Sequence, residues 1–243
     1  MKVVDCVWEQ KNIGKKTVEI GIEETDKFDE AILRHYICNY EYVVIKVPMN
    51  IPTFNIGLTS MGFGCMELQI NMSLAFEEFD FPQVQQFYND TSFKVIKRSE
   101  DLQSVLSRIE PGMFSTDRVS VDPMFGESIG CRRYLNWITT EYKKRESSLV
   151  AIYYKDCQVG FMLVKIEGDR IKLLLNGLYK TYQGKGLGIL TPASPFMYVL
   201  KNKLPIVKEL TSISSNNIPV VKLYDRLHFH IDSQTYVFVK HNV

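Results

Sequence analysis

The chain has 243 residues, of which 45% are apolar and 23% are charged, so it has enough apolar surface for one large domain or two small ones. Lysine plus arginine exceeds aspartate plus glutamate by one, 29 against 28, and this balance does not indicate binding to nucleic acid or to an anionic membrane. Five scattered cysteines without a C-x-x-C pair predict reduced thiols. Because the start does not resemble a secretory signal and no apolar run is long enough to span a membrane, we expect a cytoplasmic protein.

Residues 1–92 alternate between strand-like and helix-like patterns. We expect strands at 3–8, 16–22, 40–47 and 66–74, and a helix at 26–39. The stretch 77–90 is acidic and aromatic and is interrupted by a proline, so it is predicted to connect this part of the chain to the next.

The remaining residues predict a second organised region. It begins with a strand at 92–97, a helix at 99–110, an irregular stretch and a helix at 127–145. Three strand-like runs follow at 147–154, 158–166 and 170–179, and the turn residues Asp156 and Gly168-Asp169 predict an antiparallel meander. Helix, strand, helix and strand patterns then reach residue 241, which predicts a mixed sheet with helices on its faces.

One sequence frame occurs twice. "MNIPTFNIGLTSMGF" (49–63) and "NNIPVVKLYDRLHF" (216–229) each follow a strand-like run, carry Asn-Ile-Pro, continue with a helical pattern and end in Phe. The second copy has Tyr224 where the first has Gly57. The pattern predicts a repeated strand-helix-strand unit, with chance similarity as the alternative.

A glycine-rich turn, "YQGKGLG" (182–188), lies between a strand and a helix. Glycines lack Cβ atoms, so successive backbone N–H groups there are able to turn toward a phosphate at the start of the following helix. The spacing fits neither the dinucleotide fingerprint G-x-G-x-x-G nor a P-loop. Taken alone, the turn is equally well explained as a tight connection.

The segment Gln183-Gly184-Lys185-Gly186-Leu187-Gly188 resembles motif A of the GNAT superfamily of N-acetyltransferases. Asn217, Val220, Leu223, Tyr224 and Phe229 resemble its second signature, with His228 as a departure. The resemblance implies an α+β fold, namely a mixed, mostly antiparallel central sheet flanked by helices. It also implies that acetyl-CoA is the co-substrate.

The resemblance assigns roles to individual residues. Tyr224 would protonate the departing CoA thiolate, the alternative being a tyrosine that only packs on the sheet. Leu178 would donate its N–H to the thioester carbonyl. The cofactor-binding residues would be Leu178, Gln183, Gly184, Lys185, Gly186, Leu187, Gly188 and Asn217.

Two features depart from the usual pattern. Pro192 and Pro195 fall where the family has an unbroken helix, so we expect the helix to start late or to be kinked. No acidic residue occupies 171–181, so a general base stays unassigned, although Asn176 and Tyr179 could order a water. His228 and His230 lack a third ligand nearby, and we expect no metal.

The first 92 residues resemble the N-terminal part of TDP-fucosamine acetyltransferases, in which a degenerate GNAT-like segment precedes a complete domain. We therefore predict a partial GNAT-like α/β domain at 1–92 and a catalytic domain at 93–243. The stretch 115–138 also resembles that group, which makes Arg118, Ser120 and Asp122 candidate acceptor contacts, or alternatively loop caps.

These resemblances imply acetyl transfer to the amino group of a deoxyamino sugar carried on a nucleotide. Two alternatives are an acetyltransferase for a polyamine, amino acid or antibiotic amine, and a non-catalytic CoA-binding protein. A homodimer is implied by the resemblance alone.

Overall fold

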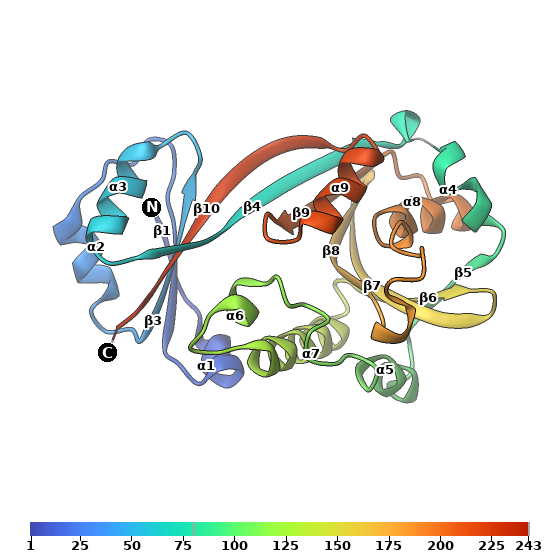
Figure 1. Ribbon diagram of the computed structural model, residues 1–243, viewed down its shortest axis with the longest axis horizontal. Helices are drawn as coiled ribbons and strands as arrows, with labels where there is room; N and C mark the ends of the chain where they lie inside the picture. Colours follow the sequence, from blue (N-terminus) through green and yellow to red (C-terminus); the bar gives the residue numbers. More distant parts are fainter. Residues whose placement is uncertain (80, 243) are drawn as a thin grey trace.

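The computed structural model describes residues 1–79 and 81–242. Within them a ten-stranded sheet runs the length of the molecule in the order β1-β2-β3-β10-β4-β9-β8-β7-β6-β5 (Figure 1). The pairs β2–β3 and β8–β9 are parallel, and the other neighbouring strands are antiparallel. The predicted fold class, a mixed and mostly antiparallel sheet flanked by helices, is confirmed.

The first part of the chain forms four strands and three helices within its described residues. They are β1 (Lys2–Asp5), α1 (Val7–Ile13), β2 (Thr17–Gly21), α2 (Glu30–Ile37), β3 (Tyr42–Pro48), α3 (Pro52–Ser60) and β4 (Gly64–Ala75). The strand predicted at 3–8 is too long, because helix α1 begins at Val7. Gly14 ends that helix in the left-handed conformation, with φ 76°, and its N–H donates to the Gln10 carbonyl.

The second part begins with the short turn Phe76–Glu78 and helix α4 (Phe81–Tyr88), where a connector was predicted. Pro82 lies in the first turn of α4, where a proline costs no intrahelical hydrogen bond. The elements that follow are β5 (Thr91–Val95), α5 (Ser99–Leu106), α6 (Arg118–Val121), α7 (Glu127–Lys144), β6 (Ser148–Tyr154), β7 (Cys157–Glu167), β8 (Arg170–Leu178), the turn Lys180–Tyr182, α8 (Leu190–Asn202), β9 (Lys208–Ser214), α9 (Ile218–Arg226) and β10 (His230–His241).

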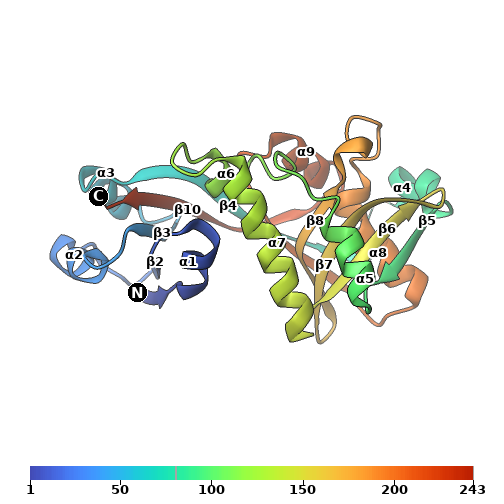
Figure 2. The ribbon, with the colours of Figure 1, turned by 90° about the horizontal axis from the view of Figure 1, so that it is seen from below.

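Strands β6, β7 and β8 form the predicted antiparallel meander. Lys155 and Asp156, with φ 47° and 62°, turn the chain between β6 and β7, and Gly168 has φ 63° before β8. The meander has helices on both faces. Helices α8 and α9 pack on one face around an apolar core, whereas α5 and α7 cover the other (Figure 2).

The two copies of the repeated frame form equivalent units, β3-α3-β4 and β9-α9-β10. Strand β4 lies between β10 and β9, and β10 lies between β3 and β4, so the last strand of each unit is inserted into the sheet of the other (Figure 1). Since a single sheet runs through both parts, the domain boundary at residue 92 stays a prediction.

The residues at which the two copies differ have different surroundings. Gly57 lies on α3, and a Cβ atom there would clash with the ring of Phe28. Tyr224 lies on α9 in the separate core beneath α8. Packing against Phe28 therefore gives a physical reason for the glycine in the first copy.

Candidate active site

The strands β8 and β9 separate part-way along their length. They are paired in parallel from Arg170 opposite Lys208 to Leu173 opposite Thr211, but β8 continues to Leu178 and β9 to Ser214. Beyond the last pair the two strands diverge and leave a V-shaped opening in the sheet. We refer to this opening as the splay.

Backbone groups of β8 point into the splay. The N–H of Tyr179 donates to the Val159 carbonyl of β7 at 3.0 Å. Because N–H groups alternate in direction along a strand, the N–H and carbonyl of Leu178 point away from β7, toward the splay. The Leu178 carbonyl accepts a hydrogen bond from Gln183 Nε2 at 3.0 Å, which ties the glycine-rich loop to the end of β8.

Two of the three glycines in this loop have conformations that other residues rarely adopt. Gly184 and Gly186 have φ values of 72° and 78°, and a Cβ atom on either would meet nothing within 4 Å. Glycine is therefore favoured at both positions by the backbone conformation and not by a lack of space. Gly188 has no such φ, and a Cβ atom there would make an ordinary contact of 3.5 Å with Leu223.

A pocket of about 260 Å³ lies beside this loop. Backbone of the loop and the start of α8 forms one wall, and α9 and α4 form the others. Its lining residues are Gln83, Gln86, Phe87, Gly186, Gly188, Ile189, Leu223 and Arg226. The first turn of α8 has no side-chain cap, and the positive end of the helix dipole lies at the loop.

The two prolines of α8 do not break it, because their missing hydrogen bonds are replaced. Pro192 lies in the first turn, and the Gly188 carbonyl accepts from the N–H and the hydroxyl of Thr191, at 3.1 and 2.7 Å. Pro195 leaves the Thr191 carbonyl without a helical partner. Asn176 Nδ2 donates to that carbonyl at 2.7 Å. The helix runs from Leu190 to Asn202 and therefore includes both prolines.

Tyr224 lies at the base of the splay with 2% of its surface exposed. Its hydroxyl is 3.5 Å from Thr211 Oγ1, on the last residue of β9 that pairs with β8. Burial raises the pKa of the Tyr224 hydroxyl and the nearby Glu209 raises it further, whereas hydrogen bonds from Thr211 and Asn176 oppose the rise. The hydroxyl therefore keeps its proton at neutral pH.

Glu209 is a buried acid that sequence reasoning missed. Its side chain has no exposed surface, and among the described residues neither carboxyl oxygen has a hydrogen-bond partner. Burial raises the pKa of this carboxyl well above its ordinary value of 4.5. A neutral acid therefore lies on β9 two residues before Thr211, on the face that contacts Tyr224.

Solved structures share this arrangement of elements. A conserved protein of unknown function from Staphylococcus epidermidis has a TM-score of 0.63 and 12% identity, over 94% of this chain and 85% of that one. A tandem GNAT protein from the clavulanic acid biosynthesis pathway has a TM-score of 0.58 and 12% identity, over 93% and 75% of the two chains. A GCN5-related N-acetyltransferase from Sphaerobacter thermophilus has a TM-score of 0.55 and 12% identity, over 82% of this chain and 59% of that one.

The chain has the GNAT fold. The match to the tandem GNAT protein extends over both repeated units, whereas this chain spans 59% of the length of the Sphaerobacter protein. No protein-family model matches the sequence, and no curated protein matches it. The resemblance to TDP-fucosamine acetyltransferases stays a prediction.

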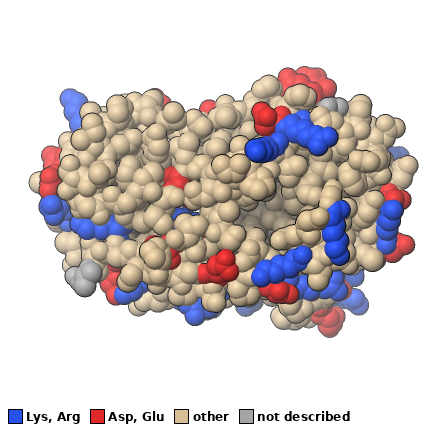
Figure 3. All heavy atoms as spheres, viewed as in Figure 1, with Lys and Arg blue, Asp and Glu red and all other residues tan. Residues whose placement is uncertain are grey.

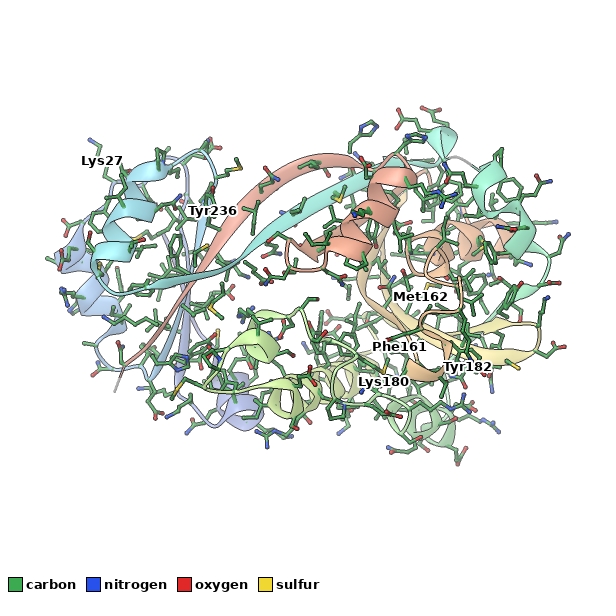
Figure 4. All side chains as sticks on the ribbon, in the orientation of Figure 1. Lys27, Phe161, Met162, Lys180, Tyr182 and Tyr236 are labelled. Carbon is green, nitrogen blue, oxygen red and sulfur yellow. The ribbon has the colours of Figure 1, made fainter. Side chains whose placement is uncertain are left out.

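The remaining residues of the GNAT signatures lie around the splay. Asn217 caps α9, because its side-chain oxygen accepts from the Val220 N–H at 3.3 Å. Lys185 and Leu187 lie in the glycine-rich loop, and the Lys185 ammonium is 5.4 Å from the centre of the Tyr182 ring. Figure 4 shows Lys180 and Tyr182 near Phe161 of β7, where the chain leaves β8.

Asn176 and Tyr179 do not share a site. Asn176 contacts α8 and Tyr224 on one face of the sheet, whereas Tyr179 is buried in the core on the opposite face. The Tyr179 hydroxyl accepts from Gln158 Nε2 at 2.9 Å. The hypothesis that Asn176 and Tyr179 order one water therefore has no support in the structure.

The three candidate acceptor residues lie near α6, where two of them already make structural contacts. Ser120 packs directly against the backbone of Gly130 in α7. Asp122 accepts from the Met124 N–H at 2.9 Å and contacts His241 Nε2 at 2.8 Å. The hydrogen bond from Met124 is of the kind that a loop cap makes, which was the alternative role predicted for Asp122.

Arg118 belongs to a buried charged group between the two parts of the chain. Arg133 Nε donates to Glu9 at 2.7 Å, Arg118 is 3.9 Å from the same carboxylate, and Tyr134 donates to Asp117 at 3.0 Å. Among the described residues Arg118 Nε has no hydrogen-bond partner. Sequence reasoning found Arg118 but missed its acidic partner Glu9, which comes from a distant segment.

The surface is hollowed next to the splay. In Figure 3 the hollow lies between α9 and β9 on one side and α6 and α7 on the other, and Lys and Arg side chains border it. No group of three or more His, Cys, Asp or Glu side chains within residues 1–79 and 81–242 is placed to hold a metal ion. In the same part of the chain, no helix has the length and apolar character needed to cross a bilayer.

Proposed function

We propose that this chain is an N-acetyltransferase that moves an acetyl group from acetyl-CoA to a primary amine. The observation that carries the proposal is the splay itself, with Leu178 on one strand, Tyr224 at its base and the glycine-rich loop at its end. A buried opening with a backbone donor on one side and a protonated acid below suits acyl transfer from a thioester.

The residues present fit coenzyme A. The N–H groups of Gly184 to Gly188 offer donors for a pyrophosphate, the positive end of the α8 dipole lies beside them, and the adjacent pocket is bounded by α9. Arg226 adds a positive charge to that pocket. Acetyl-CoA, when bound there, supplies the activated acyl group.

Each step of the transfer has a candidate residue. The Leu178 N–H donates to the thioester carbonyl oxygen, where negative charge develops as the amine attacks. The Tyr224 hydroxyl gives its proton to the sulfur as the C–S bond breaks. Asn217 contributes to the cofactor site by fixing the start of α9.

The proposed acceptor is the amino group of a nucleotide-linked deoxyamino sugar. Beside the sequence resemblance, the face of the sheet next to the splay is polar, which suits an acceptor with many hydroxyl groups. Its polar residues include Gln69, which donates to Ser212 at 2.8 Å, and Asn71, which donates to Ser233 at 2.9 Å. A polyamine, amino acid or antibiotic amine is the second candidate, and a CoA-binding protein without turnover is the third.

Thiol release tests the proposal. Purified protein is incubated with acetyl-CoA and a panel of nucleotide amino sugars and free amines, and free CoA thiol is measured. Turnover with the amino sugars alone supports the first acceptor class, and turnover with free amines alone removes it. CoA binding without turnover on any amine supports the third candidate.

Tyr224→Phe tests the general acid. Loss of a positioned acid lowers kcat by about 10²- to 10⁴-fold, and we expect CoA binding to be unchanged. Tyr198→Phe is the matched control, because Tyr198 lies in the same core on α8 and its ring packs against Phe93. Full turnover by Tyr224→Phe would contradict the assignment of the acid.

A further inference from the structure

In the proposed reaction, the group that accepts the proton of the attacking amine has not yet been assigned. As the amine attacks the thioester, its nitrogen must lose a proton, yet β8 carries no acidic side chain from Ile171 to Leu178. Glu209 is neutral and lies on the Tyr224 side of the sheet. The base must therefore come from the other face, which is open to the hollow in Figure 3.

Glu67 lies on that face, at the mouth of the splay. It belongs to β4, which pairs with β9 as far as Gln69 opposite Ser214. Glu67 precedes Gln69 by two residues on β4 and lies beyond the last β4–β9 pair. It therefore flanks the chain where β9 ends. Its carboxyl is close enough to Ser214 for the serine hydroxyl to lower its pKa, and that hydroxyl also lies 3.4 Å from the Thr116 carbonyl, to which it donates.

Hydrogen bonds hold the end of β9 against this part of β4. The Leu68 N–H donates to Ser215 Oγ at 2.9 Å, and Asn216 Nδ2 donates to the Met66 carbonyl at 3.0 Å. Since side chains alternate along a strand, Glu67 points to the opposite face from Leu68, and a register shift at Met66 marks a bulge on its other side. Its position relative to Ser214 is therefore fixed by the backbone on both sides.

Ser214 and Leu178 lie at a similar depth in the splay. Ser214 is three residues beyond Thr211, and Leu178 is five beyond Leu173. Strand β8 has a register shift relative to β7 between Leu173 and Leu178, where one extra residue of β8 is accommodated. The five residues of β8 therefore span about the same length as four regular ones. An amine that attacks a thioester held by the Leu178 N–H would thus be level with Ser214 and the adjacent Glu67.

The charged groups that face Glu67 lie on β3, on α6 and at the N-cap of α6. Burial raises the pKa of the Glu67 carboxyl, the Ser214 hydrogen bond and the charges of Arg118 and Lys46 oppose the rise, and Asp117 adds to it. Tyr134 of α7 also lies within electrostatic range of Glu67. A carboxylate whose pKa is shifted toward neutrality is a better match for a base that works near pH 7.

We propose that Glu67 is the general base, supplied to the catalytic half by the N-terminal half through the exchanged strand β4. The proton on the amine nitrogen passes to the Glu67 carboxylate, directly or through the Ser214 hydroxyl, as the nitrogen lone pair forms the bond to the acyl carbon. Glu67 later releases that proton to solvent, while the thiolate takes its proton from Tyr224. This inference rests on the proposed function.

The proposed role of Glu67 would explain why the first copy of the repeated frame is present. That half lacks the glycine-rich loop and has Gly57 in place of a tyrosine, so it has no cofactor site of its own kind. Its last strand nevertheless carries Glu67 to the face of the splay that is open to the hollow in Figure 3. The alternative, a purely structural partner for Arg118, predicts different kinetics.

Glu67→Gln separates the two roles, because glutamine keeps the size and the Ser214 contact but cannot accept the proton. We expect turnover at pH 7 to fall by about 10²-fold or more, and the acid limb of the kcat/KM pH profile to disappear. CoA affinity should be unchanged. The deficit should shrink with acceptor amines of low pKa, which are already neutral.

Glu19→Gln is the matched control, because Glu19 is another carboxylate that faces Arg118 but lies on β2 and pairs with Lys46. Equal losses in both variants, or a Glu67→Gln enzyme with normal turnover and an intact acid limb, would overturn the role of Glu67 alone. A wild-type chain that binds CoA but acetylates no amine would instead remove the proposed function, and this inference with it.

Discussion

Replacing Glu209 by glutamine is expected to flatten the pH dependence of stability. The folded chain keeps a proton on this buried carboxyl at pH values at which the unfolded chain, with a pKa near 4.5, has lost it. The folded state therefore binds more protons, and stability falls as pH rises above 4.5 toward the pKa of the folded carboxyl. Below pH 4.5 both states are protonated and this loss is absent.

The size of the effect follows from the linkage relation. Each pH unit within that window costs the wild-type chain up to about 1.4 kcal/mol of unfolding free energy. For a domain of this size, about 1.4 kcal/mol corresponds to a fall in Tm of roughly 3–6 °C. Glu209→Gln carries no ionisable group and should not show this component.

Thermal unfolding at several pH values measures the difference. Glu77→Gln is the control, since it removes an exposed carboxyl of the same kind and should keep the wild-type slope. If the Tm curves of wild type and Glu209→Gln stay parallel from pH 5.5 to 7.5, the carboxyl is ionised or partnered in the folded protein and the reasoning fails.

Three further predictions concern backbone and packing. Gly186→Ala should weaken CoA binding and cost about 1 kcal/mol, because of its positive φ, whereas Gly188→Ala should be tolerated; calorimetric titration with CoA compares them. Gly57→Ala should destabilise the fold by about 1–3 kcal/mol in urea unfolding, and Phe28→Ala in the same chain should make that substitution nearly neutral, as a double-mutant cycle would show. Asn176→Leu should lower stability by about 1–3 kcal/mol because the α8 carbonyl that it bonds becomes unsatisfied, and an unchanged Tm would contradict this.

Local motifs predicted the parts of the site that lie close together in the sequence. The glycine-rich loop, Leu178 and Tyr224 could be placed because each has a recognisable neighbour pattern and a fixed position relative to a strand or helix. The meander could be predicted because its turn residues, such as Asp156, favour the conformations that tight hairpins need.

The parts that sequence reasoning missed depend on contacts between distant segments. The hydrogen bond from Asn176 to the Thr191 carbonyl explains why Pro195 is tolerated, but it joins a strand to a helix across the glycine-rich loop. Nothing in the local pattern of Asn176 indicates that partner. The prolines predicted a disturbed helix, and the structure instead supplies the missing donor from β8.

Because β4 and β10 are exchanged between the two halves, the candidate base could not be predicted from the second half of the sequence alone. In sequence, Glu67 lies in a strand of the first unit, more than a hundred residues from Tyr224, and an alternating strand pattern does not specify its neighbours. In space β4 lies beside β9, whose two faces carry Glu67's partner Ser214 and Tyr224's partner Thr211. The proposed acid and base thus approach one splay from opposite faces of β9, Tyr224 beside Thr211 and Glu67 beside Ser214.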